Sequence, residues 1–247
     1  MQEYTYNYKC VVSYDGSMYQ GFQMQHDEPT IEYEITKALK IITKEDTKIY
    51  GSGRTDKGVH AFGQVFNFHT NLNVPDDKLL YAINRALPED IRVISVEKVD
   101  NDFHARFSAK SKEYRYYIKY QNYSPMHSRY SLYIENLDLP LMQEAIKLFL
   151  GTHDFKGFCS AEVDERKDCV KTITKAEILK RGDFYEFTFE GTGFLKYQIR
   201  RMMALLISIG QHKETKEKIL QLYETKEKQM HYRNTPGTGL YLYRVDY

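Results

Sequence analysis

Apolar and polar positions follow two different periods along this chain, and both occur in its first hundred residues. Residues 5–14 alternate in the two-residue pattern of a half-buried strand. Residues 29–42 instead carry apolar side chains at helical spacing, and Thr30 is a typical start signal for that helix. The same patterns predict further strands at 47–52, 63–70 and 91–99, and a helix at 75–87. The predicted order of this half is therefore β-α-β-β-α-β.

The rest of the chain repeats that order. It contains predicted strands at 112–120, 170–180, 183–190 and 239–247, helices at 137–150 and 194–210, and an additional charged helix at 214–229. Two successive split βαβ arrangements predict an α/β (α+β) fold made of two ferredoxin-like βαββαβ units. We expect them to form one continuous, mainly antiparallel sheet with the helices packed on one side. The predicted domains are residues 1–105 and 106–247.

Composition excludes several classes of protein. The chain has 247 residues with 35 basic and 34 acidic side chains, so any nucleic-acid site has to come from local clusters of charge. The three cysteines, Cys10, Cys159 and Cys169, lack zinc-ligand spacing and predict free thiols in a reducing cytoplasm. No metal site is expected. The longest apolar run, 202–209, is too short to span a bilayer, and no signal peptide is recognisable, which predicts a soluble cytoplasmic protein.

The most informative loop is GSGRTDKGVHAFGQ, residues 51–64. Both common phosphate-binding loops require glycine where this loop has Asp56, and a carboxylate there repels phosphate. An unperturbed aspartate has a pKa near ~3.9 and is ionised at neutral pH, so Asp56 is a candidate nucleophile or general base, and Arg54 and Lys57 flank it with positive charge. The alternative is a turn aspartate that caps its own backbone. For His60, the favoured interpretation is a partly buried histidine at the start of a strand.

A second stretch, residues 103–120, interleaves basic and aromatic side chains. On a strand, Tyr114 and Tyr116 share one face, while Arg115 and Lys119 share the other. This arrangement predicts either base stacking beside phosphate-binding cations or an ordinary amphipathic strand with a solvated basic face.

A third stretch, residues 191–210, contains an apolar helix with three cations in its first half: Lys196, Arg200 and Arg201. Cations near a helix start are unfavourable for the macrodipole, which indicates an anionic partner. Lys196 and Arg200 are four residues apart and are expected to share a helical face. A solvated charged face is the alternative.

Taken together, these stretches resemble the tRNA pseudouridine synthase A (TruA-type) family. The resemblance includes YDGSMYQGFQMQ at 14–25, GRTDKGVHAFGQ at 53–64 and DFHARFSAKSKEYRY at 102–116, together with the helix from Phe194 and the closing GLYLYRVDY. These segments occur in the family's order over essentially the whole chain.

The resemblance implies an isomerase that converts uridine to pseudouridine in the anticodon stem-loop of tRNA, at positions 38–40. It assigns the nucleophile to Asp56, which attacks C1′ or C6 or acts through a glycal. It also assigns stacking on the target base to Tyr114, orientation of Asp56 and RNA to Arg54 and Arg200, and backbone contacts to Lys57 and Arg106. The family works as a homodimer without metal, nucleotide or redox cofactor, in a cleft at the seam of the two units.

The chain departs from the family pattern beside the expected site. Phe22 replaces a common tryptophan, Glu113 stands where a basic residue is common, and Lys196, Gln198 and Arg201 replace the usual residues of the late helix. These departures leave two alternatives: a related synthase that modifies another RNA, and a non-catalytic RNA-binding protein with the same fold.

Overall fold

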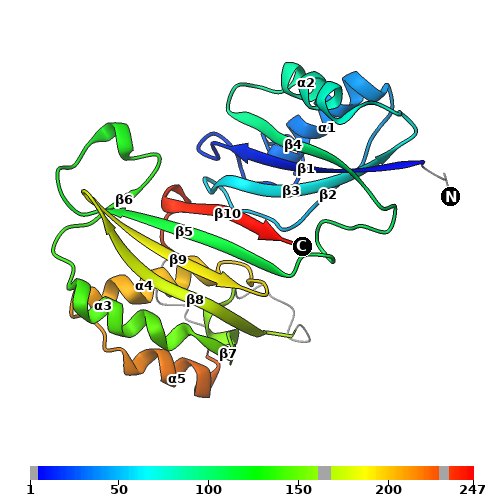
Figure 1. The fold of residues 1–247 in the computed structure, drawn as a ribbon. Coiled ribbons are helices and arrows are strands. Elements are labelled where there is room, and N and C mark those ends of the chain that lie inside the picture. The colour runs from blue at the N-terminus through cyan, green and yellow to red at the C-terminus, as the bar shows by residue number, and fades with distance from the viewer. Residues whose placement is uncertain (1–4, 161–167, 228–233) are drawn as a thin grey trace. The chain divides into compact units, whose positions relative to one another are not determined.

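The structure is a computed structural model that describes residues 5–160, 168–227 and 234–247 (Figure 1). The chain forms two compact units: unit 1 is Met1–Lys110 with Tyr241–Tyr247, and unit 2 is Ser111–Leu240. The boundary at Lys110 lies five residues after the one expected from sequence. Residues Tyr241–Tyr247, which form most of the C-terminal strand, group with unit 1, and no local sequence pattern records such a long-range grouping.

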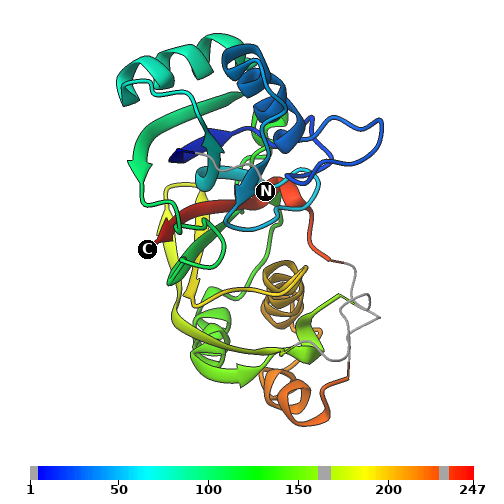
Figure 2. The same ribbon diagram turned by 90° about the vertical axis from the view of Figure 1, so that its right-hand side faces the viewer.

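Unit 1 has the predicted βαββαβ order. Its elements are β1 (Tyr6–Tyr14), α1 (Ile31–Thr43), β2 (Ile49–Gly51), β3 (His60–Thr70), α2 (Asp76–Ala86) and β4 (Ile91–Val99). Strand β1 pairs antiparallel with β3 and with β4, and β2 pairs antiparallel with β3. This strand order, 4-1-3-2, is the one the ferredoxin-like prediction requires. Helices α1 and α2 lie on the same face of this sheet (Figures 1 and 2).

Strand β10 (Leu240–Asp246) completes unit 1. It runs parallel to β3, with Tyr241 opposite His60, so the end of the chain lies beside the start of β3. The main-chain N–H of Lys110 also donates to the carbonyl of Asp246 over 2.8 Å. These contacts explain why both segments belong to the same unit.

Local chemistry accounts for the first helix. The Thr30 side chain accepts the N–H of Tyr33, which satisfies one of the orphan donors at the helix start, and two acidic residues in the first turn complement the macrodipole. The helix ends at Lys44, which adopts the left-handed conformation with φ 62°. Its apolar face, including Ile35 and Leu39, is fully buried in the core with Phe66 of β3.

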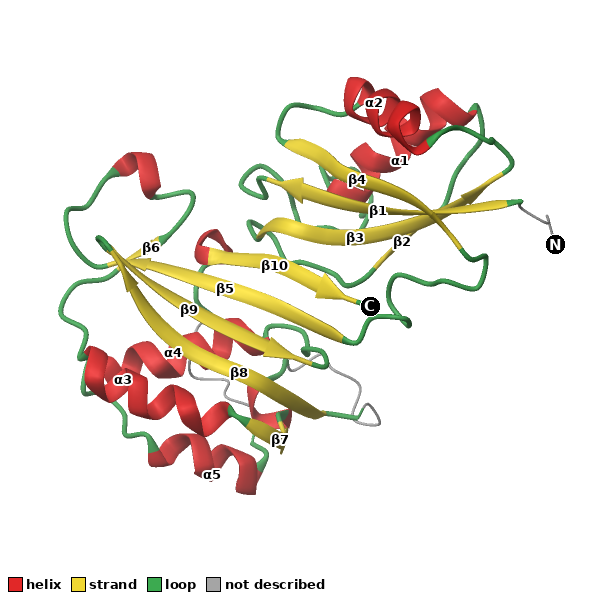
Figure 3. Ribbon diagram, in the orientation of Figure 1, coloured by secondary structure: helices red, strands yellow, loops and turns green. Residues whose placement is uncertain are grey.

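Unit 2 is built on an antiparallel sheet in the order β5-β9-β8-β7, with helices on one face (Figure 3). Its strands are β5 (Ser111–Lys119), β6 (Leu132–Tyr133), β7 (Gly151–Asp154), β8 (Val170–Arg181) and β9 (Phe184–Gly191), and its helices are α3 (Leu139–Ile146), α4 (Gln198–Gly210) and α5 (Glu217–Thr225). The predicted β8–β9 hairpin is confirmed, and Gly182 turns it with φ 56°. The short strands β6 and β7 were not predicted, because two to four residues are too few for a periodic pattern.

Helix α4 begins four residues later than predicted. Tyr197 adopts φ 65° before the first turn, and the Gln198 side chain accepts the N–H of Leu195 over 2.9 Å while the Gln198 N–H donates to the Leu195 carbonyl. Lys196 therefore precedes the helix, and the expectation that it shares a helical face with Arg200 is wrong. The predicted charged helix at 214–229 ends at Thr225, and its residues 228–229 lie outside the described part of the chain.

Within the described ranges, the helices are too short or too polar to cross a bilayer. Among the described strand pairs within each unit, β10 with β3 and β5 with β6 are parallel and the others are antiparallel. The fold is thus mixed α/β with mainly antiparallel sheets, as predicted.

Candidate active site

Asp56 lies in the loop that links β2 to β3, next to the point where β1 ends. Its side chain is half-buried, whereas the flanking Arg54 and Lys57 are exposed. The Asp56 carbonyl accepts the N–H of Val59 over 3.1 Å, which closes a turn, and Gly58 inside that turn adopts φ 73°. Only glycine adopts this conformation without strain, so one glycine of the motif serves the turn itself.

The loop that follows β1, residues 15–23, holds the Asp56 loop from the other side. The N–H of Phe22 donates to the Thr55 carbonyl over 3.0 Å, and the N–H of Gly58 donates to the Tyr19 carbonyl over 3.3 Å. The two loops are in close contact at Gly21, whose φ is 109°. A Cβ at this position would lie 2.6 Å from the Thr55 carbonyl oxygen, so there is no space for a side chain. The first two motifs of the resemblance are thus one packed structure.

Buried polar side chains support the same loop from beneath. The hydroxyl groups of Tyr14 and Thr55 are 2.8 Å apart. The Gln64 side chain accepts the Ser52 hydroxyl over 2.6 Å and donates to the Gly53 carbonyl over 2.9 Å. Sequence reasoning missed these contacts. Tyr14 and Gln64 both lie in quoted motifs, but no sequence pattern signals their contacts with the loop.

His60 is the first residue of β3 and is only 2% exposed, which confirms the interpretation of a buried histidine that starts a strand. The N–H of Gly16 donates to its Nδ1 over 3.2 Å, and an Asp15 carboxylate oxygen lies 3.2 Å from the same nitrogen. The imidazole stacks on the ring of Tyr241, with centroids 4.6 Å apart. His60 therefore joins the loop after β1 to the C-terminal strand.

Arg106 also belongs to unit 1, on the segment that follows β4. Its side chain is exposed, but the backbone beside it is anchored by amides from β1 and β3. The Asn7 side chain donates to the Phe103 carbonyl over 2.9 Å, and the N–H of Ala105 donates to the Asn67 side chain over 2.9 Å. The Asn67 amide also donates to Asn7 over 2.9 Å, so two fully buried asparagines share the anchoring. An exposed cation on a fixed backbone is suited to contact phosphate.

Tyr114 lies on β5 in unit 2, on the face that packs against the helices, and is 8% exposed. Its ring meets Phe194 edge to face, with centroids 5.3 Å apart. Phe194 belongs to the turn that precedes α4, so this contact joins the strand to the start of the helix.

The opposite face of β5 differs from the solvated basic face considered as an alternative. Arg115 forms ion pairs with Glu113, 2.8 Å away, and with Glu186, 3.4 Å away. Lys119 is 5% exposed and pairs with Asp183 over 3.3 Å. Acidic partners inside unit 2 neutralise these cations, and Glu113, a departure from the family pattern, is one of them. Both residues are therefore poorer phosphate ligands than their sequence suggests.

Arg200 and Arg201 have different surroundings at the start of α4. The Arg200 Nε donates to the Thr235 carbonyl over 2.6 Å, and the Thr235 hydroxyl donates back to the Arg200 carbonyl over 3.1 Å. Arg201 is 8% exposed and donates to the Asn234 side chain and the Cys159 carbonyl, and burial lowers its pKa. Arg201 thus has a structural role, whereas Arg200 is half-buried with its guanidinium 5.2 Å from the Tyr197 ring centroid.

Comparison with known proteins shows to which family this chain belongs. A family model described as tRNA pseudouridine synthase matches residues 10–108 and 145–247. The chain belongs to the tRNA pseudouridine synthase family. It is 39% identical over 242 residues to tRNA pseudouridine synthase A of Anoxybacillus flavithermus, covering 97% of this chain and 98% of that one. It is 41% identical to the Exiguobacterium sp. enzyme of the same name, covering 97% of each chain, and 39% identical to the Bacillus subtilis one, covering 97% and 98%.

Within this pseudouridine synthase, the six predicted site residues fall into two groups. Arg54, Asp56 and Lys57 share one loop of unit 1 and Arg106 lies on another segment of that unit, whereas Tyr114 and Arg200 belong to unit 2. Besides the Asp56 loop, the predicted site residues therefore lie on three separate elements.

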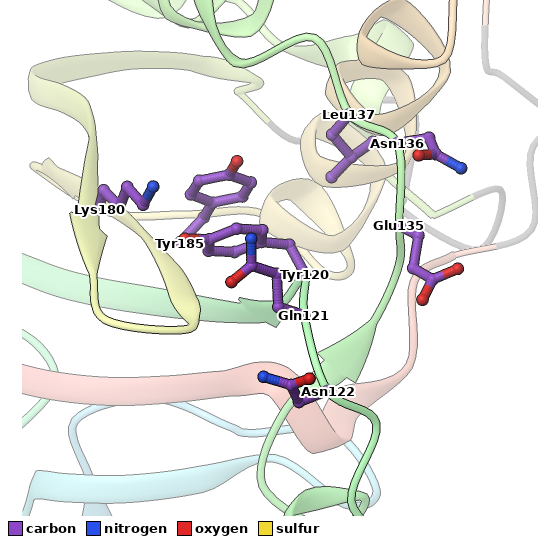
Figure 4. Close-up of a pocket in the computed structure, with 8 residues that line it drawn as sticks. All are labelled: Tyr120, Gln121, Asn122, Glu135, Asn136, Leu137, Lys180 and Tyr185. Atoms are coloured by element: carbon purple, nitrogen blue, oxygen red, sulfur yellow. The ribbon is translucent and has the colours of Figure 1, made fainter.

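A surface hollow of ≈ 600 Å³ in unit 2 of the synthase contains none of the six residues (Figure 4). Tyr120 and Tyr185 stack on its wall with centroids 4.1 Å apart, and the Lys180 ammonium lies 5.3 Å from the Tyr120 ring centroid. The remaining lining residues are Gln121, Asn122, Glu135, Asn136 and Leu137.

Proposed function

We propose that this enzyme isomerises uridine to pseudouridine in the anticodon stem-loop of tRNA, at positions 38–40, with Asp56 as its nucleophile. The observation that carries the proposal is the Asp56 loop itself. It presents a carboxylate between two exposed cations, and backbone and side-chain hydrogen bonds hold the loop on both sides. A fixed carboxylate can meet a reacting carbon without first being ordered.

The reaction needs no external electrons or atoms. The bond between C1′ and N1 of uridine breaks, the base turns while it stays bound, and C1′ bonds to C5. The C5 hydrogen leaves as a proton, and N1 carries a hydrogen in the product. Asp56 acts by attack at C1′ or C6, or by stabilising charge while a glycal forms. The target base has to leave its stack first, which costs a few kcal/mol.

The other site residues receive the roles that the family resemblance implies. Tyr114 offers an aromatic ring for the target base, and Arg54 and Arg200 orient the carboxylate and the RNA. Lys57 and Arg106, both exposed, contact the RNA backbone. Contacts between cations and phosphates position an RNA without reading its sequence.

Tritium release tests the reaction, because pseudouridine formation frees the C5 hydrogen. We expect release from C5-labelled tRNA transcripts with the wild type and a drop of about 10³-fold or more with Asp56→Asn. Asp77→Asn, in the first turn of α2, is the matched acidic control and keeps full activity. Equal release by wild type and Asp56→Asn contradicts the assigned nucleophile.

Transcripts with cytidine at positions 38–40 test the target. Loss of release from these transcripts supports the anticodon stem-loop, whereas unchanged release places the modified uridines elsewhere in tRNA. Absence of release from every tRNA transcript favours the alternative of a related synthase that modifies another RNA.

We further propose that the enzyme is a cytoplasmic homodimer. No disulfide joins the three cysteines, all of which the structure describes, and this suits a reducing compartment. Light scattering during gel filtration is expected to give twice the mass of the chain. A mass equal to one chain over the range of working concentrations contradicts the dimer.

A further inference from the structure

The environment of Thr55, the residue before Asp56, is unusually constrained. Its side chain is 7% exposed, and its hydroxyl group lies 2.8 Å from that of Tyr14. Its carbonyl accepts the N–H of Phe22 over 3.0 Å. Both the side chain and the backbone of Thr55 are thus fixed, so the direction in which the chain enters Asp56 is fixed as well.

Gln64 extends this support to the start of the loop. This residue of β3 is fully buried, and its amide is bonded on both sides: the oxygen accepts the Ser52 hydroxyl over 2.6 Å and the Val65 N–H over 3.1 Å, and the nitrogen donates to the Gly53 carbonyl over 2.9 Å. The Tyr14 hydroxyl also interacts with the Gln64 side chain. Tyr14, Ser52, Thr55 and Gln64 therefore form one continuous buried network.

The protonation state of the network is fixed too. Burial raises the pKa of the Tyr14 phenol well above its usual range, so that its hydroxyl stays neutral and retains its proton throughout the physiological pH range. Amide and threonine side chains do not titrate there. The network therefore offers no proton to the reaction, and what it supplies is geometry.

We propose that Tyr14, Thr55 and Gln64 are positioning residues, which set the orientation of the Asp56 carboxylate through the backbone of Gly53–Thr55 without touching the RNA. This inference rests on the proposed role of Asp56. It predicts that loss of the network lowers the rate of the chemical step and leaves tRNA binding unchanged. A displacement of the order of 1 Å at a reacting group costs about a hundredfold in rate, and a partial loss of support costs less.

The decisive variants change single atoms. Tyr14→Phe removes one hydroxyl, Thr55→Val replaces a hydroxyl with a methyl group, and Thr55→Ser keeps the hydroxyl. Tyr8→Phe is the matched control: Tyr8 is a fully buried tyrosine on the same strand, and its hydroxyl bonds to the Val74 carbonyl over 2.9 Å instead. Tyr8 and Tyr14 are six residues apart, which is about 20 Å along a strand.

For each variant, kcat and KM come from tritium release, the tRNA dissociation constant from equilibrium binding, and the Tm from thermal unfolding. We expect kcat to fall about tenfold or more for Tyr14→Phe and Thr55→Val, with KM and tRNA affinity within about twofold of wild type. Thr55→Ser is expected to retain most of the wild-type kcat. Tyr8→Phe is expected to lower Tm about as much as Tyr14→Phe while kcat stays at the wild-type value.

Two results overturn the inference. In the first, Asp56→Asn is inactive but Tyr14→Phe and Thr55→Val keep the wild-type kcat, or lose no more of it than Tyr8→Phe does; the network is then structural only, and the role of Asp56 stands. In the second, Asp56→Asn remains active; the proposed nucleophile and its positioning network then fail together.

Discussion

At the scale of single residues, the surroundings of His104 favour the neutral form of its imidazole. Its Nδ1 accepts the N–H of Arg106 over 3.1 Å, which requires the neutral imidazole. Burial lowers the pKa of His104, and the nearby charge of Arg106 lowers it further. The pKa of His104 is therefore lower in the folded protein than in the unfolded chain.

The sign of the resulting pH dependence follows directly. Because the folded state binds this proton less readily than the unfolded state, His104 reduces stability as the pH falls below about 6.5. We expect NMR titration to give His104 a pKa below that value. We also expect His104→Gln to lose less stability than wild type between pH 7 and pH 5. A titration midpoint at or above 6.5 contradicts this.

Gly16, Gly21 and Gly182 distinguish two reasons why a larger residue would be strained: a positive φ and a lack of space for a Cβ. Gly182 has φ 56° and an open position for a Cβ, whereas a Cβ on Gly16 would lie 2.0 Å from the Val59 carbonyl oxygen. Gly21 combines φ 109° with a Cβ position 2.6 Å from the Thr55 carbonyl oxygen. Alanine at Gly182 is expected to cost about 1–2 kcal/mol of unfolding free energy, the usual cost of a left-handed residue.

Alanine at Gly16 or Gly21 is expected to cost more than at Gly182, because the two loops around Asp56 have to separate. Urea denaturation measures these costs, and tritium release measures activity, which falls only for Gly16→Ala and Gly21→Ala. Equal stability and activity of the three variants would show that the structure of the two loops does not depend on close contact at Gly16 and Gly21.

At the scale of elements, the segment with Arg106 depends on β1 and β3 for its position. Asn67→Leu removes the acceptor of the Ala105 N–H and the donor to the Asn7 side-chain oxygen, and we expect the unfolding free energy to fall by about 1–3 kcal/mol. The affinity for tRNA is expected to fall as well, because Arg106 loses its fixed backbone. Asn71→Leu is the control. Asn71 is exposed, its side-chain oxygen accepts the Thr5 N–H, and we expect the unfolding free energy to change by no more than about 0.5 kcal/mol. Equal effects of the two variants on urea denaturation would contradict the anchoring.

Elements were predictable from sequence where their signals are local. The cap at Thr30 and the acidic first turn marked α1 to within two residues, because helix starts satisfy their own backbone donors with nearby side chains. The start of α4 was misplaced, because the left-handed conformation of Tyr197 leaves no trace in a pattern of apolar positions. Asp56 was found because it stands where a phosphate loop has glycine. The support of its loop by Gln64 was not found, since those contacts join residues eleven and twelve positions apart through tertiary folding.

At the scale of the whole molecule, the near-balanced charge limits how tRNA is bound. With 35 basic and 34 acidic residues, binding depends on a few local cations. We expect Lys57→Gln and Arg106→Gln each to lower the slope of log affinity against log salt by about 1, the value for one lost phosphate contact. Fluorescence anisotropy with labelled tRNA over a series of salt concentrations measures this. Lys78→Gln, an exposed lysine of α2 beside Asp77, is the control and leaves the slope unchanged. A similar change for all three variants would indicate a diffuse charge effect.

The order of elements was predictable at this scale, but the pairing of β10 with β3 was not. Local patterns placed it as the last strand of the second half, and they carried no information on its pairing with β3. Strand pairing is a contact between distant segments, and a periodic pattern gives the existence of a strand without naming its neighbour.

That pairing has a consequence for how the protein is made on the ribosome. Chains are synthesised from the N-terminus at about 5–20 residues per second, so a nascent chain contains β1 to β4 long before it contains Tyr241. Until then, His60 lacks the ring on which it stacks, and the start of β3 lacks its parallel neighbour. All of unit 2 has to be translated in between. The contacts of β10 with His60 and β3 therefore form last. A polypeptide that is truncated before Tyr241 contains Asp56 but lacks these contacts.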